Sequence, residues 1–479
     1  MYLRILFIIA IFGAFSTTLA DDVSEKQFSP INSLTESLPQ NNKKQINLVI
    51  DTTILQINSS IPYISSSAEL SSSSIAHDSS NTAALANSSE TIVQTAESSP
   101  DSATVLKSAS SNASTKKAEN NTHVKGKPNP YNLPDELMPL WDSMTLRQKA
   151  AQKIMVYLTS SQFVIENEIG GLLITGKHLQ EANTYLSKLE EINSKLKIPV
   201  FTATDQEGGI VNRLSSYSKN WERLPSAREM RHMDTNKIHQ HANKVGQMLK
   251  ELKINMNLAP VLDPSKDYSG KNSFMEENRR SWGNDTSIAY KVRSFVNGMQ
   301  ENGIICVSKH FPGYDSWTNS DLQIAVSASP KEKIEKNVEF FRTLANDIPV
   351  TMMSSVHFLR ISGRPAVFDG NIVKMARRGY PDMVMLTDDL WGTSLRTWAS
   401  GKTQIPPRKN YPDKDFKRLV TAIIDADNDI LMISFTSKAI NILDIMTNLC
   451  EKSSKYKRRI EESAARILKL KYKAGILKP

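Results

Sequence analysis

Apolar and polar positions alternate regularly along most of the chain, from about residue 128 onward. Short apolar runs of strand length are separated by stretches in which apolar residues recur every three or four positions, as along one face of a helix. Eight such runs occur: "KIMVYL", "IGGLLIT", "IPVFTATD", "INMNLAPVLD", "IICVSKHF", "IPVTMMSSVHF", "MVMLTDD" and "NDILMISF". Helical patterns such as "LQEANTYLSKLEEINSKL" and "SIAYKVRSFVNGMQENG" lie between them. Eight strand–helix units close a barrel, so we predict an α/β, (β/α)8 TIM barrel over residues 128–479. A doubly wound open sheet is the alternative.

Ionisable residues stand at the carboxyl ends of five of these runs. In a barrel, the carboxyl ends of all strands converge on one face, where catalytic side chains lie. Each of these residues alone is more often a structural cap or a loop charge. Their repetition at successive strand ends favours the barrel over the open sheet. The residues are Asp205, Asp263, Lys309 with His310, His357, and Asp388 with Asp389.

The N-terminal part of the chain has a different composition. Residues 1–20 contain Arg4, the apolar run "ILFIIAIFGAF" and the ending "STTLA", which are typical of a secretory signal peptide cleaved after Ala20. An uncleaved N-terminal anchor is the alternative. Residues 21–127 are rich in Ser, Asn, Thr and Ala and have no sustained periodicity, so we predict a disordered linker. We therefore expect an exported protein, periplasmic or extracellular depending on the host.

The formal net charge of +9 alone would suit nucleic acid or another anionic polymer as a partner. The basic residues are dispersed, however, except in "KYKRR" and "KLKYK" near the end. There they alternate with apolar residues, as on the solvated face of a closing helix. We expect a monomer with no nucleic-acid partner and no membrane span after signal cleavage. The two cysteines, Cys306 and Cys450, lie in apolar segments and are predicted to be buried thiols.

The candidate site combines several carboxylates with a few cationic donors. The histidines are too scattered for a zinc cluster, and "DQEGG" lacks the spacing of a nucleotide-binding loop, so we expect no metal and no cofactor. Glycoside hydrolysis requires a nucleophilic carboxylate and a separate proton donor. The residue types therefore favour a neutral, polyhydroxylated substrate.

Five motifs follow one another in the chain: "TDQEGGIVNRL", "NLAPVLD", "RRSWGND", "SKHFPG" and "MLTDDL". In order and approximate spacing they resemble family 3 of the glycoside hydrolases, and within it the single-barrel β-N-acetylhexosaminidases. The resemblance covers Leu133 to Leu477 and none of the Ser-rich segment. It implies a retaining β-N-acetylglucosaminidase that hydrolyses terminal β-linked N-acetylhexosamine from peptidoglycan-type or chitin-type glycans.

The resemblance also implies roles for individual residues. Asp388 matches the nucleophile that forms the covalent glycosyl intermediate, whereas a helix N-cap role suits Asp389 better. For Arg280 and Lys309, a structural salt bridge at the barrel mouth is the alternative to substrate binding. Gly208 and Gly209 are predicted to be turn residues. The positions that match sugar-binding residues are Asp205, Arg213, Arg280, Lys309 and His310.

One loop departs from the family pattern. Members of the subgroup carry Lys-His-Phe-Pro-Gly-His-Gly…Asp-Ser-His, in which the last histidine is a mobile general acid/base tuned by the aspartate. In "KHFPGYDSWTNSDLQ", which is about one residue shorter, Tyr314 and Asp315 replace His-Gly. Asn319 then replaces the tuning aspartate, and Asp321 replaces the histidine.

Two hypotheses follow from this loop. In the first, the chain is an active glycosidase in which Asp321, or in second place Asp315, is the general acid/base. An ordinary aspartate with a pKa near 4 is ionised at neutral pH, so burial or a facing anion such as Asp388 must raise that pKa. In the second, the chain is a catalytically impaired barrel that binds glycans. The sugar-binding positions and Asp388 favour the enzyme, and the altered loop favours the binding protein.

Overall fold

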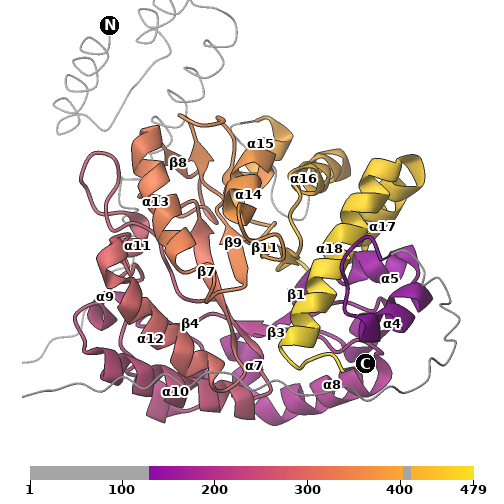
Figure 1. Cartoon of the computed structure of the whole chain (residues 1–479), viewed down its shortest axis with the longest axis horizontal. Coiled ribbons are helices and arrows are strands. Elements are labelled where there is room, and N and C mark those ends of the chain that lie inside the picture. The colour runs from indigo at the N-terminus through magenta and orange to yellow at the C-terminus, as the bar shows by residue number, and fades with distance from the viewer. Residues whose placement is uncertain (1–128, 403–410, 479) are drawn as a thin grey trace, which may run out of the picture. The chain divides into compact units, whose positions relative to one another are not determined.

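In the computed structural model, which describes residues 129–402 and 411–478, eight parallel strands form one sheet in the order β11-β9-β7-β6-β3-β2-β1-β12. The two ends of this sheet meet. Leu386 in β11 pairs in parallel with Ile430, next to β12, and the Thr387 amide donates to the Ile430 carbonyl at 2.9 Å. The sheet is therefore closed into a barrel with helices packed around it (Figure 1). The predicted TIM barrel is confirmed, and the open sheet is excluded.

Each barrel strand lies within one of the eight predicted apolar runs. Two further strand pairs, β4 with β5 and β8 with β10, belong to the loops at the carboxyl ends. These pairs are too short to show a hydrophobic period. The strands are β1 Ile154–Tyr157, β2 Gly171–Leu173, β3 Phe201–Thr204, β4 Gln206–Gly208, β5 Val211–Asn212, β6 Met256–Asn257, β7 Ile305–Phe311, β8 Val326–Ser327, β9 Val350–Met353, β10 His357–Phe358, β11 Val384–Thr387 and β12 Leu431–Ile433.

Several helices begin at side chains that satisfy free backbone amides. Asp234 accepts from the Asn236 and Lys237 amides at the start of α10, and Thr145 forms a capping box with Gln148 at the start of α5. The α-helices are α4 Met138–Ser143, α5 Leu146–Ala151, α6 Ser161–Glu166, α7 Gly176–Gln180, α8 Ala182–Lys195, α9 Ala227–Met230, α10 Thr235–Glu251, α11 Phe274–Glu277, α12 Ala289–Gln300, α13 Lys331–Thr343, α14 Gly370–Arg377, α15 Thr393–Ser400, α16 Asp413–Asp425, α17 Lys438–Lys452 and α18 Ser454–Lys473. In the part of the chain that the structure describes, none of them is long and apolar enough to cross a bilayer.

The apolar core has two layers. The barrel interior is filled by strand residues such as Met155, Phe201 and Val307, and a larger outer layer joins the strands to the surrounding helices. Cys306 and Cys450 are free, buried thiols, as predicted. Both layers keep the strands fixed, so the loops at their carboxyl ends start from rigid positions.

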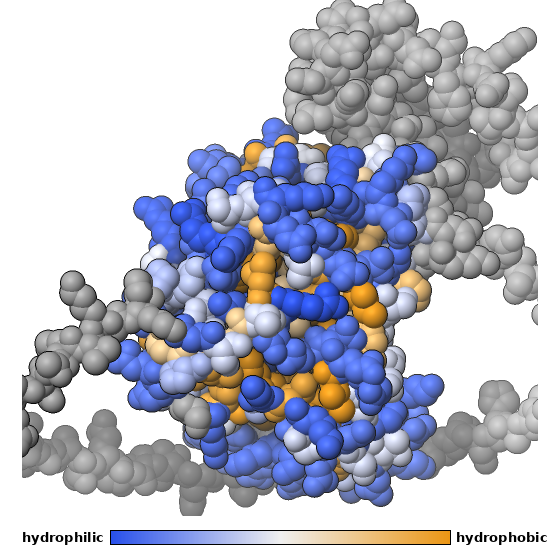
Figure 2. Space-filling view, turned by 90° about the vertical axis from the view of Figure 1, so that its right-hand side faces the viewer, coloured by the Kyte–Doolittle hydropathy of each residue, from blue (hydrophilic) through white to orange (hydrophobic). Residues whose placement is uncertain are grey.

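The C-terminal helix α18 completes the barrel interior. Its residues Ile467 and Leu470 pack into the same cluster as the inward-facing strand residues. Much of its basic character is on the outside, where Lys455 pairs with Asp425 and Arg458 lies near Glu462. The surface on this side of the molecule is mostly hydrophilic (Figure 2).

One basic residue of α18 contradicts the predicted solvated face. Lys471 is fully buried and donates to the Gln152 side-chain oxygen at 2.8 Å and to the Gly170 carbonyl at 2.9 Å. Its ammonium group lies over the Phe201 ring, 4.9 Å from the centroid. Burial lowers the pKa of Lys471 to about 7. The alternating pattern of "KLKYK" does not reveal this burial. The four-carbon side chain of Lys471 is long enough to reach carbonyl groups at the amino ends of the strands.

Lys471 should make the stability of the fold depend on pH. Its pKa is about 7 in the folded chain and 10.5 normally, so the unfolded chain binds more protons between these values. The free energy of unfolding should therefore rise with pH in this range, by at most about 1.4 kcal/mol per pH unit. Lys471→Met should lose this slope in urea unfolding between pH 7 and 9. The exposed control Lys455→Met should keep it, and equal slopes in all three proteins would contradict the prediction.

Candidate active site

The first part of the site is a hairpin that follows β3. Strands β4 and β5 pair around a turn in which Gly208 and Gly209 have φ values of 90° and 56°. Such positive values favour glycine, and a Cβ at Gly208 would also come within 2.1 Å of the Pro225 carbonyl oxygen. The predicted turn role of both glycines is therefore confirmed. The hairpin fixes Glu207 directly after Asp205 and Gln206.

A chain of alternating charges links this hairpin to two other strand ends. The buried Lys309 ammonium lies 2.7 Å from Asp205 Oδ1 and 2.6 Å from Glu207 Oε1. Arg280 forms a bidentate pair with Glu207, with distances of 2.8 and 2.9 Å. Arg213 lies at the outer end, 3.9 Å from Asp205 Oδ2. The structure thus brings four predicted sugar-binding residues together.

Glu207 is the centre of this cluster, and sequence reasoning missed it. Burial alone would raise its pKa, but the charges of Arg280 and Lys309 lower it to about 2. Glu207 is therefore ionised and holds both cations. The only signal in the sequence was an acidic residue in "DQEGG", which a hairpin turn would explain equally well.

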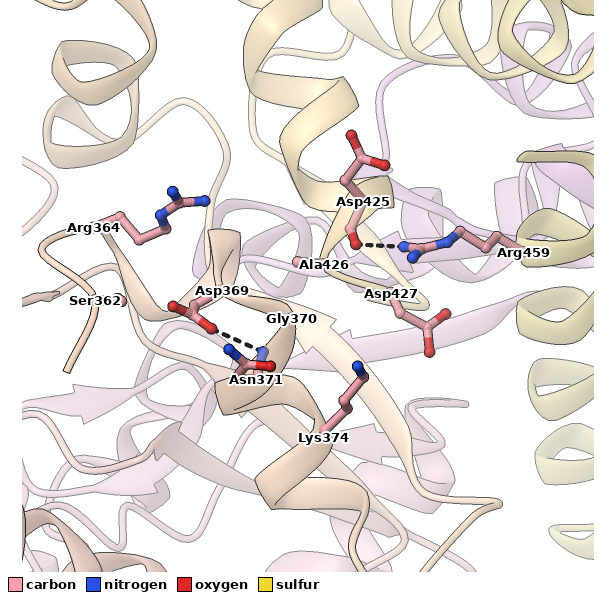
Figure 3. Close-up of a pocket in the computed structure, with 10 residues that line it drawn as sticks. All are labelled: Ser362, Arg364, Asp369, Gly370, Asn371, Lys374, Asp425, Ala426, Asp427 and Arg459. Carbon is pink, nitrogen blue, oxygen red and sulfur yellow. Dashed lines mark hydrogen bonds between the residues drawn. The ribbon is translucent and has the colours of Figure 1, made fainter. Parts of the chain in front are cut away.

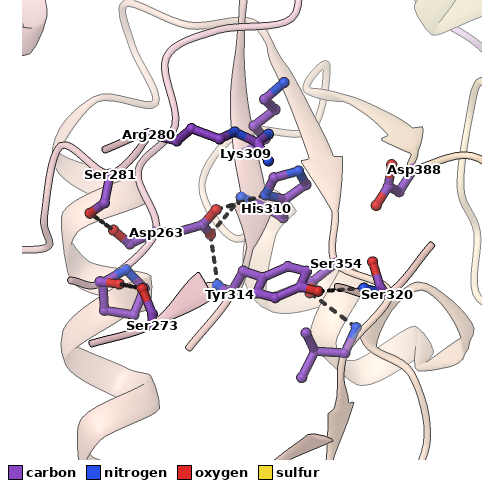
Figure 4. A network of polar contacts seen from close by, with 12 residues as sticks. Asp263, Ser273, Arg280, Ser281, Lys309, His310, Tyr314, Ser320, Ser354 and Asp388 are labelled. Carbon is purple, nitrogen blue, oxygen red and sulfur yellow. Dashed lines mark hydrogen bonds and ion pairs between the residues drawn. The ribbon is translucent and has the colours of Figure 1, made fainter. Parts of the chain in front are cut away.

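The fifth predicted binding residue, His310, follows Lys309 directly. Neighbouring residues of a regular strand face opposite sides, but the pairing of β7 with β9 shifts register between Lys309 and Phe311. The Lys309–His310 peptide bond is cis. His310 Nδ1 lies 2.7 Å from Asp263 Oδ2, and Asp263 Oδ1 accepts from the His310 amide at 2.8 Å. Asp263 therefore orients the imidazole (Figure 4).

Asp388 lies at the end of β11, across from Lys309 and His310 (Figure 4). Its Oδ2 atom is 3.4 Å from the Ser355 hydroxyl, and its Oδ1 atom accepts from the Asp389 amide at 2.9 Å. No cation pairs with Asp388 within salt-bridge distance among the described residues, which leaves its carboxylate available as a nucleophile. Asp389 is different, because its Oδ1 accepts from the Trp391 and Ser434 amides. The predicted N-cap role of Asp389 is wrong in detail, since Gly392 is the N-cap of α15.

The replaced loop brings Asp321 to the same mouth. Solvent still reaches Asp321, yet partial burial and the nearby carboxylates of Asp388 and Asp389 raise its pKa to about 7. His310 and Arg280 are also close enough to act on this carboxyl, and they oppose the shift. Asp321 therefore has the environment that a carboxylic acid needs to carry a proton near neutral pH.

Asp315, the second candidate for proton transfer, has its side chain bound to serines at the base of its own loop. It is buried, and its Oδ2 atom accepts from the Ser327 hydroxyl at 3.0 Å and from the Ser329 hydroxyl. Burial raises the pKa of Asp315. These serines lie in and next to β8, so the side chain anchors the base of the loop. Its geometry therefore favours a structural role.

His357, also expected at this face, does not join the cluster. It lies in β10, where its amide donates to the Ala325 carbonyl, and its imidazole is buried. Burial lowers the pKa of His357 to about 4, so the ring is neutral. The apolar run that includes His357 contains two strands, because β9 ends at Met353 and His357 begins the separate strand β10.

A separate cavity of about 290 Å³ contains none of the predicted site residues (Figure 3). Its lining has as many acidic as basic residues: Asp369, Asp425 and Asp427, and Arg364, Lys374 and Arg459. Among the described residues, no cluster of His, Cys, Asp and Glu has an arrangement that could hold a metal ion.

Comparisons with known proteins show what this chain is similar to. A β-hexosaminidase, LpqI of Mycobacterium tuberculosis, is 27% identical over 298 residues, covering 57% of this chain and 73% of that protein. An uncharacterized secreted glycosyl hydrolase of Arthroderma benhamiae is 33% identical over 260 residues, covering 49% and 69%. A β-N-acetylhexosaminidase structure from Beutenbergia cavernae covers 69% of this chain and 99% of its own, with 21% identity and a TM-score of 0.57.

The family comparison covers most of the barrel. Residues 145–470 match the glycosyl hydrolase family 3 N terminal domain. The matched range includes every strand of the barrel and all the residues of the site described above. The chain therefore belongs to family 3 of the glycosyl hydrolases and is a glycoside hydrolase.

Proposed function

We propose that this glycoside hydrolase is a retaining β-N-acetylglucosaminidase that removes terminal β-linked N-acetylhexosamine from peptidoglycan-type or chitin-type glycans. The proposal is supported by the β-hexosaminidase names of its relatives and by the barrel-mouth residues. We also propose that the protein is exported, on the basis of the signal-like N-terminus and the relative described as secreted. The N-terminal segment lies outside the described residues.

In the proposed mechanism, the cluster of charged residues around Glu207 binds the sugar. Asp205 and the partly exposed Arg213 offer an acceptor and a donor at the mouth, and Lys309, Arg280 and His310 offer donors beside them. Because ion pairs already fix these groups, they need little reorganisation when hydroxyl groups arrive. Asp388 then attacks the anomeric carbon, and the bond from that carbon to the leaving oxygen breaks.

The observation that carries the proposal is that Asp321 lies close enough to Asp388 and Asp389 for their charges to raise its pKa. The raised pKa of Asp321, about 7, leaves a useful fraction protonated at neutral pH. Asp321 gives its proton to the leaving oxygen, and the resulting carboxylate then takes a proton from the water that releases the sugar from Asp388. The same residue thus acts first as an acid and then as a base.

The effect of Asp321→Asn on the rate of hydrolysis should depend on the leaving group of the substrate. Dinitrophenyl N-acetyl-β-glucosaminide needs little protonation and should still form the glycosyl-enzyme in a burst. Hydrolysis of the N-acetylglucosamine disaccharide should fall about 10²–10⁴-fold. In the wild type this hydrolysis should decline as pH rises through 7, because Asp321 loses its proton there.

Azide gives an independent measure of the same role. With Asp321→Ala and the dinitrophenyl substrate, azide should attack the glycosyl-enzyme without base assistance and restore turnover, yielding the β-glycosyl azide. The surface control Asp413→Asn, 80% exposed at its side chain, should behave as wild type. Equal losses on both substrates in Asp321→Asn, or no azide rescue, would remove Asp321 from this role. A wild type that forms no adduct with either substrate would favour the glycan-binding protein.

A further inference from the structure

Tyr314, which replaces a histidine of the family pattern, is built into the loop that carries Asp321. The side chain is 1% exposed. Its hydroxyl donates to the Thr318 carbonyl at 2.6 Å and accepts from the Ser320 amide at 2.7 Å. A single hydroxyl group thus fixes the backbone on both sides of Asn319, next to Asp321.

The same short segment is held from its other side by the start of α15. The Ser394 amide donates to the Ser320 carbonyl at 3.0 Å, and the Thr393 amide donates to the Asp321 carbonyl at 3.2 Å. Helix α15 begins only a few residues after Asp388. The segment from Thr318 to Asp321 is therefore clamped between Tyr314 and the element that follows the nucleophile.

Tyr314 is also tied to the sugar-binding end of the site. Its amide donates to Asp263 Oδ1 at 2.6 Å, and this carboxylate also binds the His310 ring and amide. The Tyr314 and His310 rings pack edge to face, with centroids 5.6 Å apart. Figure 4 shows this path from Asp263 through Tyr314 to Ser320.

We propose that Tyr314 is a positioning residue that holds the Asp321 loop in the place from which Asp321 transfers protons. This inference rests on the proposed role of Asp321. An aspartate side chain is shorter than a histidine side chain, so its carboxyl can reach the leaving oxygen only if the backbone lies close to it. The shorter loop and the buried tyrosine meet this need together, and they replace a mobile donor with a fixed one.

A core tyrosine without this role would affect stability alone, so the test must measure proton transfer. Tyr314→Phe removes only the hydroxyl. Disaccharide hydrolysis should fall about 10- to 100-fold, part of the value of general acid catalysis, while the burst with the dinitrophenyl substrate stays near wild type. The decline of hydrolysis at high pH should move to lower pH as Asp321 leaves the neighbourhood of Asp388 and Asp389.

Tyr185→Phe is the matched control. Tyr185 is 2% exposed, and its hydroxyl donates to the Leu252 carbonyl at 2.8 Å, away from the site. It should lose comparable stability without a change in leaving-group dependence. Hydrogen exchange adds a readout that does not depend on activity, because the Ser320 amide should exchange faster in Tyr314→Phe and at the wild-type rate in Tyr185→Phe.

A double-mutant cycle separates the two proposals. In the Asp321→Asn background, Tyr314→Phe should cause no further loss of disaccharide hydrolysis, because the positioned group is already gone. If Asp321→Asn loses disaccharide hydrolysis but the two losses are additive, or Tyr314→Phe has no effect, the positioning role is wrong and the function of Asp321 stands. If Asp321→Asn itself has no selective effect, the proposed proton donor is wrong.

Discussion

Replacing Asp388 by asparagine should abolish formation of the glycosyl-enzyme and reduce hydrolysis of every substrate by about 10⁴-fold or more. The loss should be equal for good and poor leaving groups, because the nucleophile is required in both reactions. Asparagine keeps the size of the side chain. Its carbonyl oxygen can still accept from the Asp389 amide, which lies 2.9 Å from Asp388 Oδ1 in the wild type. The variant should therefore fold, and mass spectrometry after treatment with a 2-fluoro or 5-fluoro sugar should find no adduct.

Asp389→Asn is the neighbouring control for this experiment. Asp389 accepts from the Trp391 and Ser434 amides, and asparagine retains one carbonyl oxygen for these bonds. The control should lose some stability and keep adduct formation at residue 388. With Asp388→Gly, azide should restore turnover by attacking the opposite face of the sugar and give the α-glycosyl azide. An adduct in Asp388→Asn, or a β product here, would show that another group is the nucleophile.

Glu207→Gln should have the second largest effect, on both stability and substrate binding. Removing one partner of a buried ion pair costs about 3–5 kcal/mol of stability, because the remaining charge stays buried without compensation. Here Lys309 and Arg280 would both lose their shared counter-charge. The KM for aryl N-acetyl-β-glucosaminides should rise about tenfold or more as the cations lose their alignment. A loss of about 1.4 kcal/mol of binding free energy is enough for a tenfold change.

Glu276→Gln provides the matched control for this variant. Glu276 also pairs with two arginines, at 2.9 Å to Arg228 Nε and 2.9 Å to Arg231 Nη2, and its side chain is 11% exposed. Both variants should unfold at lower urea concentration, and only Glu207→Gln should raise the KM. An unchanged KM in Glu207→Gln would mean that Glu207 supports the barrel mouth without aligning the cations.

The pH dependence of unfolding gives a further check on Glu207. Its folded pKa of about 2 lies below the ordinary 4.5, so its stabilising effect is complete above pH 4.5 and is lost as pH falls toward 2. Glu207→Gln should lose this part of the acid dependence of the free energy of unfolding. The difference in this free energy between wild type and Glu207→Gln should be largest near neutral pH and should shrink as pH falls toward 2.

The barrel could be predicted from sequence because its strands are buried on both faces and read as continuous apolar runs. The run around Met256 was found even though the regular strand there has only two residues, because the flanking positions are also buried. The hairpin β4–β5 and the parallel pair β8–β10 could not be found. Strands of two or three residues carry no period. Strands β4 and β5 pair within one loop, and β8 and β10 pair because the loops after β7 and β9 meet.

The site could be predicted where a residue's position along a strand determines its direction. Asp205 and Asp388 follow strands directly and Lys309 lies near the end of β7, and barrel closure then brings them to one face. The direction of Asp315 depends on a contact with Ser327, in the strand that ends its loop, and the burial of Lys471 depends on Gly170, far away in the chain. Glu207 was missed for the same reason, because its importance comes from two cations supplied by other loops.

The way in which α18 seals the barrel also determines when this domain can fold. Ile467 and Leu470, which fill the interior, belong to the last helix of the described chain. Until that helix has been synthesised, the amino ends of the earlier strands expose apolar surface that only it can cover. A nascent chain of this domain therefore keeps this surface open to chaperones until α18 has been synthesised. Truncations that remove α18 should yield aggregating protein rather than a smaller barrel.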